Sequence, residues 1–171
     1  MNKLVVLSGV PGSGKSYFCK TIKKLRPSHT YIVSSDELRA MICGSQNDLS
    51  QEDLVWSLFY KLADVWSNDK EGVVVLDATH ISPSLRVDKT QDVAKKFDRV
   101  YLLMWNTPRD MVNNQNLQRE FPLAPEVMDL FFDNFELPTK KDEEFFDKII
   151  LIEDNNLLSN AIKDLELDKK N

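Results

Sequence analysis

The sequence predicts an α/β fold in which a central parallel sheet of about five strands is flanked by helices. Two observations support this fold class. Five short apolar runs rich in Val, Ile and Leu occur along the 171-residue chain, and segments with helical periodicity separate them. Such runs are typical of strands buried on both faces, and their alternation with helices indicates parallel βαβ units. The length suits one compact domain, so residues 1–171 are expected to form a single unit.

The apolar runs and the helical patterns place each element in order. We expect strands at 3–8, 31–34, 72–77, 100–105 and 148–152. We expect helices at about 15–26, 36–43, 50–67, 84–97, 108–120 and 125–135. The helix near residue 50 has the most regular pattern, because Leu54, Leu58 and Leu62 recur at helical spacing and Ser50 with Asp53 form a capping-box pattern. The tail, about 168–171, is expected to fray.

Composition and charge exclude several classes of protein. With 42% hydrophobic and 29% charged residues, the chain is ordinary for a globular protein, and no run is long enough to span a membrane. The N-terminal apolar run is too short for a secretory signal, and Cys19 and Cys43 form no CxxC pair, which favours reduced thiols in the cytoplasm. The net charge of −5 argues against a protein that coats nucleic acid, although a narrow site for one strand end is compatible with it.

The stretch GVPGSGKS, residues 9–16, satisfies the pattern G-x-x-x-x-G-K-[ST] between an expected strand and an expected helix. Glycines let consecutive backbone N–H groups turn toward one anion, and the helix N-terminus adds a positive dipole. Lys15 would reach the β- and γ-phosphates, and the Ser16 hydroxyl would ligate Mg²⁺. We therefore expect a P-loop NTPase fold that binds a nucleoside triphosphate. The expected nucleotide contacts are Gly9, Pro11, Gly12, Ser13, Gly14, Lys15, Ser16 and Tyr17.

Two further strands end in side chains suited to phosphoryl transfer. In SSDELR, Asp36 and Arg39 share one helix face, where the carboxylate could accept the proton of an attacking hydroxyl and the arginine could neutralise phosphate charge. A helix cap with Arg39 in solvent explains the same residues equally well. Asp77 ends the third strand at a Walker-B-like position, where it could hold a Mg²⁺-bound water. His80 follows it as a loop residue near the site, without partners at metal-ligand spacing.

Residues 108–135 are expected to form a lid after the fourth strand. Two helical stretches are separated there by REFPLAP, so that Arg119 could close over the nucleotide and exclude water. A connecting loop with an exposed Arg119 is the alternative. The stretch TKKD, 139–142, resembles the guanine-reading motif of GTPases, but it precedes a strand instead of following one, so ATP is the expected donor. The neighbouring KKDEE is expected to be a solvated charged turn.

Taken together, GVPGSGKS, SSDELR, DATH and QNLQR resemble the 5′-hydroxyl polynucleotide kinase branch of P-loop kinases, over about residues 3–152. The resemblance implies that Asp36 is the general base toward the 5′-OH and that Arg119 contacts the ATP phosphates from the lid. The segment 77–80 matches that family's D-A-T-N with His80 in place of Asn, and Gln115 replaces the first arginine of its lid motif R-N-x-x-R. The acceptor is expected to contact Arg39, Thr79, His80 and Arg86.

These inferences predict an ATP- and Mg²⁺-dependent kinase that transfers the γ-phosphoryl group to a hydroxyl, with the 5′ end of DNA or RNA as the favoured acceptor. Lys15, Asp36 and Arg119 are the expected catalytic residues, and Ser16 and Asp77 the expected metal ligands. Two alternatives stay open: a kinase of a nucleoside, sugar or other metabolite, which the acidic charge favours slightly, and an ATP-binding switch that acts through a partner. The oligomeric state is not determined by the sequence.

Overall fold

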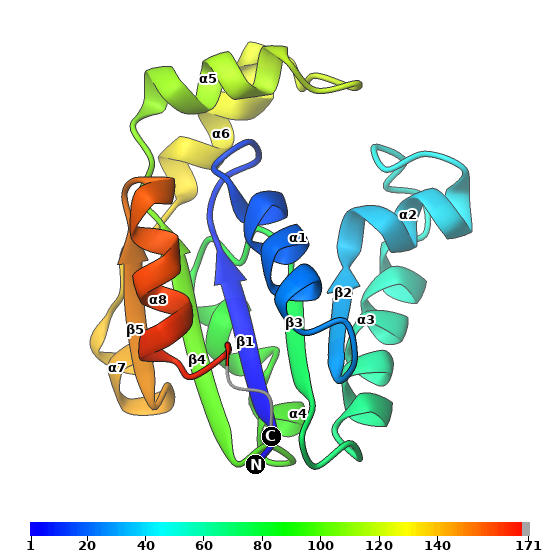
Figure 1. Ribbon diagram of the computed structural model, residues 1–171. Helices are drawn as coiled ribbons and strands as arrows, with labels where there is room; N and C mark the ends of the chain where they lie inside the picture. The colour runs from blue at the N-terminus through cyan, green and yellow to red at the C-terminus, as the bar shows by residue number, and fades with distance from the viewer. Residues whose placement is uncertain (169–171) are drawn as a thin grey trace.

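Five parallel strands form one sheet in the computed structural model, which describes residues 1–168 (Figure 1). The strands are β1 (Lys3–Ser8), β2 (Thr30–Ser34), β3 (Val73–Asp77), β4 (Arg99–Trp105) and β5 (Lys148–Ile152). They lie in the order β2-β3-β1-β4-β5, with Val5 of β1 opposite Val75 on one side and Tyr101 on the other. The predicted fold class is confirmed, and the strand boundaries agree to within one residue.

Helices cover both faces of the sheet (Figure 1). The helices are α1 (Lys15–Leu25), α2 (Ser35–Cys43), α3 (Glu52–Trp66), α4 (Gln91–Ala94), α5 (Arg109–Leu117), α6 (Pro125–Asn134), α7 (Lys140–Phe145) and α8 (Leu158–Asp164). On one face, Phe18 and Ile22 of α1 pack with residues of α8 against Val5 and Leu7. On the other face, α3, α4 and α7 pack against Leu4 and Val6. The central strand β1 is therefore buried from both sides, as its continuous apolar sequence requires.

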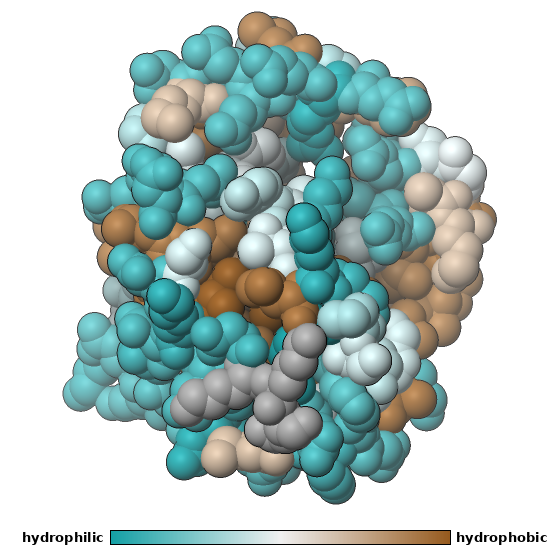
Figure 2. All heavy atoms as spheres, viewed as in Figure 1, coloured by the Kyte–Doolittle hydropathy of each residue, from teal (hydrophilic) through white to brown (hydrophobic). Residues whose placement is uncertain are grey.

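Helix α3 buries some of its apolar residues and leaves others exposed to solvent (Figure 2). Its buried residues are Val55, Phe59 and Ala63, whereas Leu54 is 46% exposed. Each fully buried aliphatic or aromatic side chain in such a stripe contributes about 1.5–3 kcal/mol. The predicted capping box is wrong, because the helix begins at Glu52 after Gln51, and the backbone N–H of Ser50 donates instead to Asp48, 2.8 Å away.

The predicted helix at 84–97 is broken in the structure. Residues Ser84–Asp88 form a π-helical turn, and only Gln91–Ala94 continue as the short helix α4. The break has a local cause: the buried Thr90 hydroxyl donates to the carbonyl of Arg86, and the N–H of Lys89 bonds to the carbonyl of Ser84. A threonine side chain that bonds a preceding carbonyl in this way competes with the regular helical ladder.

The C-terminal third differs most from expectation. The segment expected to be a solvated charged turn is helix α7, whose capping box joins Thr139 and a fully buried Asp142. Helix α8 was not predicted, and Leu167 after it is buried. Of the tail expected to fray, Asp168 is exposed, while residues 169–171 lie outside the described residues. Between residues 1 and 168, no helix combines the length and apolar character needed to cross a membrane.

Candidate active site

The phosphate cradle connects the end of β1 to the start of α1. Gly12 and Gly14 have φ angles of 80° and 118°, in the left-handed region that residues with a side chain rarely adopt. The cradle is also tightly packed: a Cβ on Gly9 would lie 2.6 Å from the hydroxyl oxygen of Ser13. Thr107 fixes the turn from the other side by donating to the carbonyl of Ser13, 2.9 Å away. Only glycine fits at these positions, as the sequence motif predicts.

The ammonium group of Lys15 lies inside the cradle. Its Nζ donates to the carbonyls of Gly9 at 2.7 Å and Val10 at 3.0 Å. Burial lowers the pKa of Lys15 from its ordinary value, while the charges of Asp77 and Asp36 act in the opposite direction. The side chain therefore places one positive charge where the phosphates of a bound nucleotide would lie.

Asp77 and Ser16 border the same cavity from the end of β3 and the first turn of α1. Burial raises the pKa of Asp77, although Lys15 opposes the shift, and the thiol of the buried Cys19 donates a hydrogen bond to this carboxylate. Within the described residues, no three His, Cys, Asp or Glu side chains form a metal cluster. One carboxylate and one hydroxyl fit Mg²⁺, which is held by few protein ligands together with phosphates and waters.

Asp36 stands at the N-terminus of α2, where its carboxylate is 50% exposed and lines the cavity. Arg39 Nη1 donates to Asp36 Oδ1 at 2.9 Å, and the same guanidinium makes a paired contact with Glu52, at 2.6 and 3.0 Å. The hydrogen bond from Arg39 lowers the pKa of Glu52. Trp56 completes the group, with its indole N–H donating to Glu52 and its ring 5.8 Å from the Arg39 guanidinium.

This arrangement contradicts the placement of Arg39 in solvent, whereas the role of Asp36 and Arg39 in phosphoryl transfer stays a prediction. Arg39 is not free in solvent, because Glu52 and Asp36 hold it, and the helix cap is provided by Ser34, whose hydroxyl accepts from the N–H of Glu37. Sequence reasoning missed Glu52, and an acidic residue in the first turn of the next helix was the available signal. Asp36 is consequently held at the cavity wall through its Oδ1, while its Oδ2 faces Arg119.

Helices α5 and α6 lie above the cradle (Figure 1). A small apolar cluster of Val10, Val112 and Met128 joins the cradle to both helices, and the buried side chain of Asn116 bonds the N–H and carbonyl of Leu123. Arg119 follows α5 and lies over the cavity, with Nη2 3.8 Å from Asp36 Oδ2. The two helices expected within 108–135 are present, with Arg119 between them and near Asp36; their action as a lid stays a prediction.

A cavity of about 1480 Å³ joins these parts. The cradle, Asp36, Asp77, Thr79, Gln115 and Arg119 all contribute to its wall. Tyr17, an expected nucleotide contact, is instead exposed on α1 and is not part of that wall.

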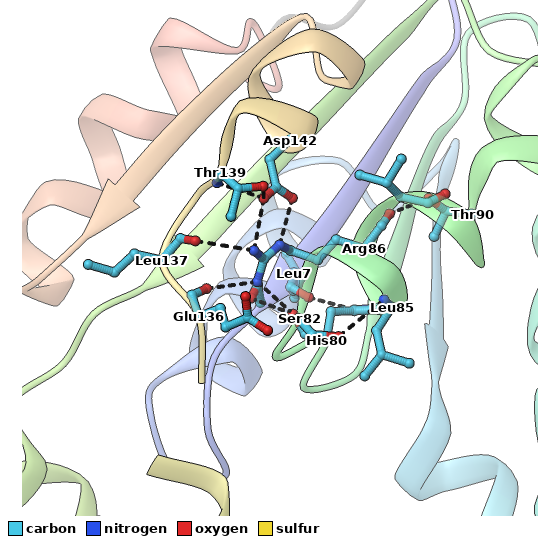
Figure 3. A network of polar contacts seen from close by, with 12 residues as sticks. Leu7, His80, Ser82, Leu85, Arg86, Thr90, Glu136, Leu137, Thr139 and Asp142 are labelled. Atoms are coloured by element: carbon cyan, nitrogen blue, oxygen red, sulfur yellow. Dashed lines mark hydrogen bonds and ion pairs between the residues drawn. The ribbon is translucent and has the colours of Figure 1, made fainter. Parts of the chain in front are cut away.

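Two expected acceptor contacts, Arg86 and His80, lie in the interior instead (Figure 3). Arg86 is 0% exposed and donates to both carboxylate oxygens of Asp142, at 2.7 and 2.9 Å, and to the carbonyl of Glu136 at 2.9 Å. Because its donors are taken up within the fold, the expectation that Arg86 contacts the acceptor is wrong.

His80 is 3% exposed, and its φ angle is 40°. Its Nδ1 lies 2.6 Å from the carbonyl of Leu7, so this nitrogen donates, and burial lowers the pKa of the ring to about 4. The backbone carbonyl of His80 accepts from the hydroxyl of Ser8 at 2.8 Å, and the carbonyl of Thr79 accepts from the N–H of Gly9 at 2.9 Å. His80 thus braces the strand that leads into the cradle and does not face the acceptor.

Comparison with known proteins supports the fold. A family model described as an AAA domain matches residues 4–138. A gluconokinase from Sinorhizobium meliloti 1021 is 16% identical, with 98% of both chains covered and a TM-score of 0.62. Chaetomium thermophilum Kti12, solved in complex with ADP-AlF3, is 14% identical over 98% of this chain and 100% of its own, with a TM-score of 0.67. A fungal RNA kinase is 18% identical over 97% and 82%, with a TM-score of 0.62.

Proposed function

Since the chain belongs to the AAA domain family and has the fold of P-loop kinases, we propose that it is an ATP-dependent kinase whose favoured acceptor is the 5′-OH of DNA or RNA. One observation carries the proposal: the half-exposed carboxylate of Asp36 opens into the same cavity as the phosphate cradle. In a phosphotransferase, a carboxylate in this cavity can orient the attacking hydroxyl and accept its proton.

The donor side rests on the cradle. The backbone N–H groups around Gly12 and Gly14 and the Lys15 ammonium bind and orient the phosphates, and Ser16 and Asp77 are the residues that would hold Mg²⁺ and its waters. The metal ion supplies charge neutralisation of the phosphate oxygens when bound. Lys15 bonds the loop carbonyls of Gly9 and Val10 and the hydroxyl of Ser13, and these hydrogen bonds can be exchanged for bonds to phosphate oxygens.

On the acceptor side, Asp36 would orient the hydroxyl and take its proton while the hydroxyl oxygen attacks the γ-phosphorus and the bond to the β-phosphate oxygen breaks, releasing ADP. Arg39 keeps this carboxylate in place through their 2.9 Å contact. The 3.8 Å pair between Arg119 and Asp36 is long, so little free energy holds Arg119 there, and it can turn toward the developing phosphate charge when the lid closes.

The nucleic-acid acceptor is favoured by the resemblance carried by SSDELR, DATH and QNLQR. The cavity of about 1480 Å³ also contains the nucleotide cradle, so it has room for a donor and an acceptor together. A small-molecule kinase is the second candidate, because one of the similar folds is described as a gluconokinase and the chain carries a net charge of −5.

The test is transfer of label from γ-labelled ATP, with Mg²⁺, to single-stranded DNA and RNA that end in 5′-OH. A panel of nucleosides and sugars is assayed beside them. We expect labelled polynucleotide ends, and absence of label on both DNA and RNA would exclude this acceptor. Label on one small molecule alone would establish the second candidate.

The Asp36→Asn variant separates a kinase from an ATP-binding switch. We expect turnover to fall about 10²- to 10⁴-fold while ATP affinity stays near that of the native protein, because the carboxylate acts on the acceptor and does not hold the donor. Asp53→Asn, at an exposed position on α3, is the matched control. Unchanged turnover in Asp36→Asn would show that position 36 has no role in the chemistry.

A further inference from the structure

The cavity continues past Asp36 along strand β2 and down toward the other end of the sheet. Its wall there consists of Lys20, Lys23 and Lys24 from α1, residues 30–32 from β2, and Trp66 from the end of α3. From Ser34 to Thr30 the strand advances four residues, which is about 13 Å at 3.3 Å per residue. We call this part of the cavity, along the edge strand β2, the β2 groove; Figure 1 shows β2 at the edge of the sheet, beside α1.

Charge is distributed unevenly along the cavity. Its acidic wall residues, Asp36, Glu37, Asp77 and Glu120, come from the strand ends and the lid, whereas the residues of the β2 groove include three lysines and no carboxylate. Lys20 and Lys24 are four residues apart and therefore share one face of α1. A local excess of positive charge in a chain of net charge −5 indicates an anionic ligand.

Aromatic rings border the cavity from the α3 face of the sheet, across the edge strand β2 from the lysines of α1. Tyr31 stacks on Trp66 with ring centroids 5.2 Å apart and an angle of 20° between the rings. The hydroxyl of Tyr31 donates to Asp69 at 2.9 Å, and His29 lies 2.7 Å from the same carboxylate, so the pair of rings is held from below. Aromatic side chains together with lysines bind unpaired bases and the phosphates between them, and here a strand that crosses the edge of β2 would meet both sets.

The open edge of β2 could in principle accept an extended peptide instead, since among the described residues no strand pairs on its outer side. Lys23 argues against this, because its Nζ donates to the carbonyl of Thr30 at 2.6 Å and so occupies an acceptor that a paired peptide would use. Lys20 and Lys24, which share one face of α1, also match a repeating phosphate better than the neutral backbone of a peptide.

We infer that the β2 groove binds the single-stranded part of a nucleic-acid acceptor, downstream of the 5′-OH that lies at Asp36. The lysines of α1 contact successive phosphates, and Trp66 with Tyr31 supports the bases. This inference rests on the proposed function and deepens it, since it specifies a single strand of several nucleotides as the acceptor.

The experiment compares binding of a dinucleotide and a decanucleotide, both with 5′-OH ends, by fluorescence anisotropy over a series of salt concentrations. Lys20→Ala with Lys24→Ala is the test variant, and Lys89→Ala with Lys95→Ala, at exposed positions near α4, is the matched control. We expect native protein to bind the decanucleotide more tightly, and the test variant to lose that advantage. Its salt dependence should decrease by about 0.7 in logarithmic slope for each lysine removed.

A second variant addresses the rings without changing charge. Trp66→Ala should weaken binding of the decanucleotide about five- to a hundredfold, with an unchanged salt slope, because base stacking is lost while the lysines remain. Circular dichroism establishes that α3 is still folded in this variant.

The outcomes separate the two proposals. If the decanucleotide binds in a way that depends on Lys20 and Lys24 but no label is transferred, the proposed binding groove is supported and the proposed kinase activity is excluded. Label transfer with equal affinity for both lengths, or with equal loss in the control pair, would keep the kinase and overturn the groove. Preferential binding of an acidic peptide over the decanucleotide would also overturn it.

Discussion

Substitution of Asp142 by Asn should strongly destabilise the protein, although Asp142 lies far along the chain from the cradle. In the native fold Arg86 and Asp142 are both 0% exposed, and two hydrogen bonds of 2.7 and 2.9 Å join them (Figure 3). The variant leaves the guanidinium buried without its counter-charge. Removal of one partner from such a pair costs about 3–5 kcal/mol, a large part of the roughly 5–15 kcal/mol that stabilises a typical domain.

The effect is measured as a shift in the thermal midpoint. For a chain of this size, each kcal/mol corresponds to about 2–4 °C, so Asp142→Asn should lower Tm by roughly 6–20 °C. Two features strengthen the expectation: Asp142 also accepts from the N–H and hydroxyl of Thr139, and Arg86 donates to the carbonyl of Glu136. Loss of the carboxylate therefore loosens the start of α7 as well as the turn that carries Arg86.

Acid sensitivity provides an independent check of the same pair. Burial alone would raise the pKa of Asp142, but the hydrogen bonds from Arg86 and Thr139 outweigh it and lower that pKa below 3.8. The stability from the pair is thus present above pH 3.8 and is lost as the pH falls through the folded-state pKa. Glu143→Gln, on the exposed side of α7, is the control. The reasoning is refuted if Asp142→Asn lowers Tm no more than Glu143→Gln does.

Three further results are expected. Burial lowers the pKa of His80 from 6.5 to about 4, so between these pH values the unfolded chain binds a proton that the folded chain does not. The free energy of unfolding should therefore fall by up to about 1.4 kcal/mol per pH unit as the pH decreases from 6.5 to 4. Denaturant titrations should show this slope in the His29→Asn variant but not in the His80→Asn variant. Lys15→Met should raise the ATP dissociation constant about ten- to a hundredfold by calorimetry, since charge-assisted bonds to phosphate are lost, and an unchanged value would contradict the cradle assignment. Arg119→Ala should lower kcat about 10³-fold or more in the label-transfer assay, with Arg99→Ala as the unaffected control; a change in KM alone would mean that the arginine only binds substrate.

Much of the site could be predicted from local sequence because its parts are local. The cradle needs glycines at fixed offsets and a lysine at the helix start, so the residues from Gly9 to Ser16 specify it without help from the rest of the chain. Asp36 and Asp77 were found because parallel strands all end at one edge of the sheet, which brings residues distant in sequence to one cavity.

The roles of some other residues depend on contacts with residues far away in the chain, and the sequence does not predict which residues make these contacts. His80 and Arg86 follow directly after the third strand, as acceptor contacts would, yet one turns inward to Leu7 and the other to Asp142, 56 residues away. The role of Glu52 in holding Arg39 likewise appears only when α3 packs beside α2.

The sequence by itself determined the five strands, the helices up to α3 and the nucleotide cradle, because hydrophobic period and glycine conformation act over a few residues. The tertiary structure alone decided which charged side chains face the cavity and which are buried in pairs. That choice depends on which long-range neighbour compensates each charge when water is removed.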